Sequence, residues 1–193
     1  MKSLLLIFLS LFSVLSQASA GINAMIAEVG SNVVASWSGD IDVSSLSPTA
    51  YPFNNDGPYV IPTTSAIENA DNTAVFYSDV FDTVITDFGT GGFSAADSTT
   101  GALFGAQFDT DQNRIILPSG FSSGSVEGSI TFNNATLASL GITENFTFSS
   151  ILNLGEGKTD TFNFGTSAVP EPSIYAVFSG LTALFFAATR RRR

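Results

Sequence analysis

The sequence predicts an all-β domain, an antiparallel β-sandwich, between two apolar terminal segments. Three observations predict this fold class. Short runs of alternating apolar and polar residues recur within residues 21–168, as strands with one solvated face require. Ser, Thr, Gly, Asn and Asp between these runs favour turns. Eighteen phenylalanines in the 193-residue chain supply the apolar area that a core between two sheets needs.

The first element is a predicted signal peptide over residues 1–20. Lys2 gives a positive start, residues 4–15 are apolar, and Ala18 and Ala20 place small side chains where signal peptidase requires them. Cleavage after Ala20 makes Gly21 the first residue of the exported chain. A permanent N-terminal anchor is the alternative, but the apolar run is shorter than the ~20 residues that a membrane span needs.

Two runs in the body, residues 21–168, predict strands most clearly. In residues 32–38 one face carries Val33, Ala35 and Trp37. In residues 125–133 one face carries Val126, Ile130 and Phe132, and the other carries Glu127, Ser129 and Thr131. Further strands are expected over residues 24–29, 74–81, 102–108, 114–117, 145–148 and 161–164. Residues 44–62 and 89–101 are expected to be long surface loops, and residues 134–140 one helical turn.

The charge and composition of the body exclude several classes of function. Sixteen acidic residues stand against Arg114 and Lys158, a net charge of −14, which repels nucleic acid phosphates and anionic lipid headgroups. The chain has no histidine and no cysteine. Histidine-based acid–base catalysis, thiol nucleophiles and Cys/His zinc sites are therefore excluded, and the fold must hold without disulfides.

One short motif in the body suggests a metal site. Asp109, Asp111 and Asn113 have the spacing at the start of a calcium-binding loop. However, Arg114 stands where such a loop has glycine, and Gly120 stands where it has glutamate. A polar turn between two strands is the favoured interpretation, and a weak calcium site in an acidic loop is the alternative.

Other polar and aromatic residues allow alternative functions. Asp40 with Asp42, and Asp109 with Asp111, place two carboxylates on one side of a strand, the minimum for a glycosidase acid pair. The phenylalanines, which alternate with Ser and Thr, are interpreted as core packing, with an exposed aromatic sugar-binding platform as the alternative. Two glycosylation sequons begin at Asn134 and Asn145.

The C-terminal segment, residues 169–193, has three parts in a fixed order. Pro170 and Pro172 hold the backbone extended, as a protease or transpeptidase cleft requires. Residues 173–189 carry no charge and have the minimum length for one transmembrane helix. Four arginines follow: Arg190, Arg191, Arg192 and Arg193. Their positive charge keeps this end in the cytoplasm and the body outside. A permanent single-span anchor is the alternative.

This arrangement, behind a signal peptide, resembles the PEP-CTERM sorting signal of bacterial exported proteins. In that family a membrane-embedded enzyme, exosortase, recognises and removes the tail as the protein is sorted to the surface or into an exopolysaccharide matrix. The resemblance implies that Pro170, Glu171 and Pro172 form the recognition element. It also implies that Ile174–Ala188 is a temporary span and that the arginines at 190–193 retain the chain. The Ser/Thr-rich body resembles the β ectodomain common among such proteins, which has no assigned activity.

We therefore expect an exported, non-enzymatic protein of the cell envelope or extracellular matrix that needs no cofactor. Its expected partners are signal peptidase, an exosortase-type enzyme and the membrane through residues 173–189, with an exopolysaccharide as a further candidate and nucleic acid excluded. It would be held in the inner membrane before processing. One alternative is a carbohydrate- or calcium-binding adhesin that uses Trp37 and the acidic loops. Another is a carboxylate-dependent glycan hydrolase.

Overall fold

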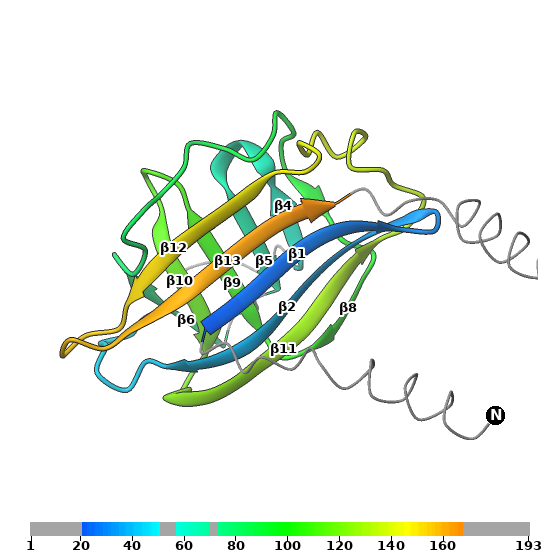
Figure 1. Ribbon diagram of the computed structural model, residues 1–193. Helices are drawn as coiled ribbons and strands as arrows, with labels where there is room; N and C mark the ends of the chain where they lie inside the picture. The colour runs from blue at the N-terminus through cyan, green and yellow to red at the C-terminus, as the bar shows by residue number, and fades with distance from the viewer. Residues whose placement is uncertain (1–20, 51–56, 70–72, 168–193) are drawn as a thin grey trace, which may run out of the picture.

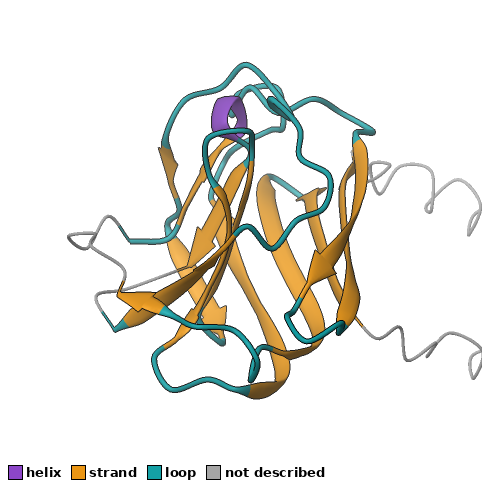
Figure 2. Cartoon of the chain, turned by 90° about the vertical axis from the view of Figure 1, so that its left-hand side faces the viewer, coloured by secondary structure: helices purple, strands orange, loops and turns teal. Residues whose placement is uncertain are grey.

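The computed structural model describes residues 21–50, 57–69 and 73–167, which form two β-sheets packed face to face (Figures 1 and 2). Sheet A contains, in spatial order, β12 (Thr147–Asn153), β13 (Thr159–Ser167), β1 (Gly21–Val29), β2 (Asn32–Asp42), β11 (Ser123–Phe132) and β8 (Ser98–Gly101). Sheet B contains β3 (Thr49–Ala50), β6 (Ala74–Ser78), β10 (Asn113–Pro118), β9 (Phe104–Phe108), β5 (Ala66–Asn69), β4 (Tyr59–Ile61) and β7 (Ser94–Ala95). The predicted all-β class and its sandwich-like architecture are confirmed.

The alternation in the sequence determines which side chains of sheet A face the core. In β2 the side chains of Val33, Ala35 and Trp37 are buried, and in β11 those of Val126, Ile130 and Phe132 are buried. The intervening polar residues lie on the opposite, solvated face. Both of the clearest strand predictions are therefore confirmed, including the assignment of their faces.

One strand pairing differs from a purely antiparallel sandwich. β1 and β13 run parallel in the middle of sheet A, with Ile22 opposite Phe162 and Ala27 opposite Ser167. These are the first and last strands of the described chain, and local alternation cannot reveal a pairing between segments so far apart. As Figure 1 shows, the chain enters β1 and leaves β13 at opposite ends of the sheet.

The core between the sheets is built from aromatic rings. Phe108 of sheet B lies with its ring centroid 5.2 Å from that of Phe148, 5.4 Å from that of Phe162 and 5.2 Å from that of Phe164, all of sheet A. Phe108 is fully buried, and Phe81 and Phe88 extend the same cluster. Phenylalanine therefore serves as core packing in this cluster, as its spacing predicts.

The two segments expected to be long loops contain short strands. Residues 44–62 include β3 and β4, and residues 89–101 include β7 and β8. These strands have two to four residues, too few for a visible alternation, and they gain their hydrogen bonds from longer neighbours.

The helical turn expected at residues 134–140 is present as one isolated hydrogen-bonded turn over residues 136–140 and not as a helix. Leu140 N donates a hydrogen bond to Thr136 O, but the chain does not continue into a second turn, because Thr136 and Ser139 also bond each other's backbone through their side chains. Among the described residues the helical structure is one 3₁₀ turn, η1 (Pro62–Thr64).

Both terminal predictions lie outside the described residues, apart from Gly21. This applies to Ala18 and Ala20, to Pro170, Glu171 and Pro172, to residues 173–189 and to the arginines at 190–193. Within the part of the chain that the structure describes, no helix is long and apolar enough to cross a membrane.

Candidate functional site

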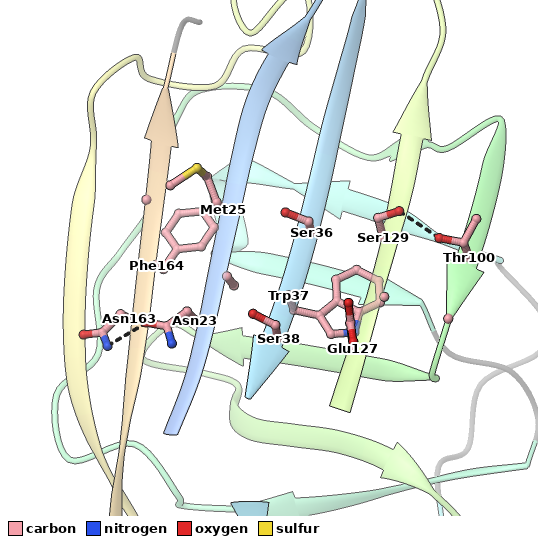
Figure 3. Close-up of a pocket in the computed structure, with 14 residues that line it drawn as sticks. Asn23, Met25, Ser36, Trp37, Ser38, Thr100, Glu127, Ser129, Asn163 and Phe164 are labelled. Carbon is pink, nitrogen blue, oxygen red and sulfur yellow. Dashed lines mark hydrogen bonds between the residues drawn. The ribbon is translucent and has the colours of Figure 1, made fainter. Parts of the chain in front are cut away.

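A groove of about 900 Å³ lies on the outer face of sheet A, the face that points away from the core. No described segment crosses in front of this face in Figure 1. Figure 3 shows the groove, whose side chains come from β13, β1, β2, β11 and β8. Its outward-facing polar residues are Asn23, Ser36, Ser38, Thr100, Glu127, Ser129 and Asn163.

The strand register aligns these side chains in rows across the sheet. In the first row, Asn163 is opposite Asn23, Asn23 is opposite Ser38, and Ser38 is opposite Glu127. Asn163 Nδ2 donates a hydrogen bond of 3.1 Å to Asn23 Oδ1, and Ser149 Oγ donates one of 2.9 Å to Asn163 Oδ1. This row therefore presents amides already oriented by their neighbours, beside the hydroxyl of Ser38 and the carboxylate of Glu127.

The second row contains the low point of the groove. Gly165 is opposite Met25, Met25 is opposite Ser36, and Ser36 is opposite Ser129. The hydroxyls of Ser129 and Thr100 are 3.0 Å apart and hydrogen bonded. Gly165 contributes no side chain, and Met25, 50% exposed, is the large apolar side chain in this row. The groove thus carries polar side chains on both rows and one large apolar side chain, Met25.

Trp37 lies beneath the groove rather than in it. Its side chain is 2% exposed and packs in the core, with its ring centroid 5.6 Å from that of Phe104. The alternative of Trp37 as an exposed sugar platform is therefore wrong, because the alternation of β2 directs it inward. Its Nε1 is buried and has no hydrogen-bond partner among the described residues.

Three carboxylates lie near one end of sheet A, around the start of β11. Asp42 accepts a hydrogen bond from Ser44 Oγ and forms an ion pair with Lys158 Nζ at 2.9 Å. The Ser44 hydroxyl and then Lys158 lower the pKa of Asp42 to about 2. Burial, and to a smaller extent the charge of Asp40, raise the pKa of Asp160. Asp40 and Asp42 do face the same side of β2, as predicted.

The candidate calcium residues form a turn between β9 and β10. Asp109 is buried, and its Oδ1 accepts hydrogen bonds from the backbone N–H groups of Asp111 and Gln112. Asn113 binds the backbone of Phe81 through both ends of its amide. Across the described ranges, no three carboxylates come together as a metal-binding group. The polar turn expected as the favoured interpretation is present.

A buried polar row on the outer face of sheet B was not predicted from the sequence. Tyr59 Oη donates a hydrogen bond to Glu68, Gln107 Nε2 lies 3.5 Å from Tyr59 Oη, and Arg114 Nε donates to Gln107 Oε1. Glu68 is only 2% exposed. The four residues lie on four different strands, so only the sheet register could reveal the row. Its members are hydrogen bonded to one another, and we interpret the row as a structural network.

No protein family, curated protein or solved structure matches this chain. Its function must therefore be argued from its own residues.

Proposed function

We propose that this protein is an exported, non-enzymatic component of the cell envelope or extracellular matrix. In this proposal signal peptidase removes residues 1–20. Residues 169–193 then hold the chain in the membrane until an exosortase-type enzyme cleaves near Pro170, Glu171 and Pro172. The observation that carries the proposal is the order of the motif, uncharged stretch and arginine cluster in the last 25 residues.

Gly21, the residue after the expected cleavage site, lies in β1 of the folded sheet. Gly21 has φ 121°, and a Cβ there would lie 2.3 Å from Thr161 O. A residue that only glycine can occupy therefore stands at the expected new N-terminus. Because Gly21 is paired with Asp40 in the folded sheet, we expect cleavage before β1 pairs.

The chemistry of the body supports a role without catalysis. The sequence has no histidine or cysteine, and two of the candidate carboxylates, Asp42 and Asp109, already have hydrogen-bond partners in the structure. Asp42 is held ionised by Lys158 and Ser44, which makes it a poor general acid. Asp109 binds the backbone of its own turn.

Intact mass and terminal sequencing of the protein recovered from its producing cells would test this function. We expect a chain that begins at Gly21 and lacks the arginines at 190–193. Replacing Pro170 and Pro172 with alanine should leave the tail attached. Replacing the exposed Pro48 with alanine is the control, and the tail should still be removed. A mature chain that begins at Gly21 but still ends at Arg193, in a cell that possesses the enzyme, contradicts the processing proposal.

A further inference from the structure

We propose that the groove on the outer face of sheet A binds a neutral polysaccharide, with the sugar chain lying across β13, β1, β2 and β11. This inference rests on the proposed function, because a polysaccharide meets this protein only outside the cell. It adds a ligand class and a binding surface to a body whose role the terminal segments leave open.

The side chains of the groove match the hydrogen-bonding groups of a sugar. Sugar hydroxyls both donate and accept, and Ser36, Ser38 and Asn23 offer hydroxyl and amide groups of both kinds. The Ser149–Asn163–Asn23 chain of hydrogen bonds fixes two of the amides before any ligand arrives. Short, oriented side chains lose little conformational entropy on binding, which favours a ligand that is itself extended.

One large apolar side chain lies among these polar groups. Met25 projects from β1 in the second row and is 50% exposed, and Gly165 beside it leaves the backbone of β13 uncovered. The C–H face of a sugar ring is apolar, and the flexible thioether side chain of methionine adapts to such a surface. One face of the sugar can therefore contact Met25 while its hydroxyls reach the polar rows.

The charge of the protein indicates a neutral glycan. Glu127 is the single charged residue among the described residues that line the groove, and the body around it carries a net charge of −14. A polyanionic polysaccharide would be repelled over several ångströms from such a surface. A neutral chain avoids this cost and still gains the hydrogen bonds.

The dimensions of the groove indicate a chain rather than a single sugar. The rows cross four neighbouring strands from β13 to β11, and at ~4.8 Å per strand they extend over roughly 14 Å. A volume of about 900 Å³ is at the upper end of the usual range for small-molecule sites, and this groove is open to solvent. Several linked sugar units fit a site of this shape better than a monosaccharide does.

The surface does not suit the other obvious occupants. A peptide that adds a strand to a sheet needs a free edge, whereas the groove lies on a face. The groove offers too few large apolar side chains for an interface with a second copy of this chain. Met25 is the large exposed apolar side chain that lines it.

Retardation in native gels that contain polysaccharide, measured on the protein recovered from its producing cells, would test the inference. The probes are hydroxyethyl cellulose and dextran as neutral glucans, the neutral exopolysaccharide fraction of the producing cell, and alginate as a polyanion. We expect retardation by at least one neutral probe and none by alginate. Retardation by alginate alone, or by no probe, would overturn the proposal.

Two variants and one control assign the binding to the groove. Gly165→Leu fills the low point, and it is tolerated sterically because a Cβ there contacts only Phe146 O, at 3.7 Å. A double change of Ser36 and Ser38 to alanine removes two exposed hydroxyls without adding volume. Both should abolish or strongly reduce retardation. Gly92→Leu, at an exposed glycine with no neighbour within 4 Å, should have no effect.

Retardation that persists unchanged in both groove variants would place binding elsewhere and overturn the proposal. The terminal masses of the same samples separate this outcome from failure of the proposed function. If the protein is processed as expected but is not retarded, only the groove inference is contradicted. If it is retarded but keeps its tail, only the processing proposal is contradicted.

Discussion

Trp37 and Gly128 are cross-strand partners in sheet A, and the indole ring of Trp37 covers the position where Gly128 has no side chain. A Cβ built on Gly128 would lie 2.7 Å from Trp37 Cζ2 and 2.7 Å from Thr100 O. An aromatic ring over a glycine in a neighbouring strand protects its backbone from water and fixes the register of the pair. This contact separates the core from the groove above it.

We predict that Gly128→Ala destabilises the protein by about 1–3 kcal/mol, because the new methyl group forces the buried indole ring to move. Gly165→Ala, in the same sheet but facing solvent, should be neutral or stabilising by up to ~1 kcal/mol. Urea denaturation of the two variants measures the difference. Equal stability of the variants would contradict the packing of Trp37 against Gly128.

Phe108 should be the most costly phenylalanine to truncate in the aromatic core. Its ring contacts five others, including Phe148, Phe162 and Phe164 of the opposite sheet. We expect Phe108→Ala to lower the free energy of unfolding by about 3–5 kcal/mol. Phe93→Ala, at an exposed ring, is the control and should cost less than ~1 kcal/mol. Thermal denaturation followed by circular dichroism measures the midpoints of the two variants. Similar midpoints would contradict the role of Phe108 in packing the two sheets together.

Asp42 should contribute to the acid dependence of stability. Its pKa in the folded protein is about 2, against an ordinary value of 3.8, so the folded state binds this proton less readily than the unfolded chain. The stabilisation is therefore present above pH 3.8 and is lost as the pH falls from 3.8 through about 2.

Asp42→Asn should lower the denaturation midpoint near neutral pH and match the wild type at about pH 2. The effect should be small, because the pair with Lys158 is exposed to solvent. High salt should reduce it further. The exposed Asp87→Asn is the control. A difference between wild type and Asp42→Asn that stays constant down to pH 2 would contradict this assignment.

The Asp109 turn should depend on hydrogen bonds within the chain and not on calcium. Asp109→Ala leaves the N–H groups of Asp111 and Gln112 without their acceptor and should cost about 1–3 kcal/mol. Asp111→Ala, at an exposed position, should cost less than ~0.5 kcal/mol. The thermal midpoint of the wild type should be the same in calcium and in EDTA. A calcium-dependent rise that Asp109→Ala abolishes would instead support the metal site.

The strands whose buried faces could be predicted from the sequence are those whose alternation is long. β2 and β11 have eleven and ten residues, and the predicted faces of both are the observed ones. β3 and β7 have two residues each and leave no such pattern. Their pairing depends on β6 and β4, so only the assembled sheet determines them.

The candidate site could be predicted only in part, for the same physical reason. Alternation already assigns Glu127 and Ser129 to a solvated face. It cannot show that Asn163 and Asn23 come together, because their contact depends on a parallel pairing between the two ends of the body. The adhesin alternative uses Trp37 as a ligand contact, whereas the alternation of β2 places its side chain inside.

The parallel pairing of β1 with β13 also constrains how the protein is made. β1 lies between β2 and β13. Asn23 of β1 pairs with Asn163 of β13, which follows it by 140 residues in the chain. The pairing of β1 with β13 therefore cannot form until nearly the whole body has been synthesised. Contacts between residues so far apart in the sequence form slowly. Under the export that we propose, the chain would stay incompletely folded during transport and would complete its central sheet only after β13 emerges.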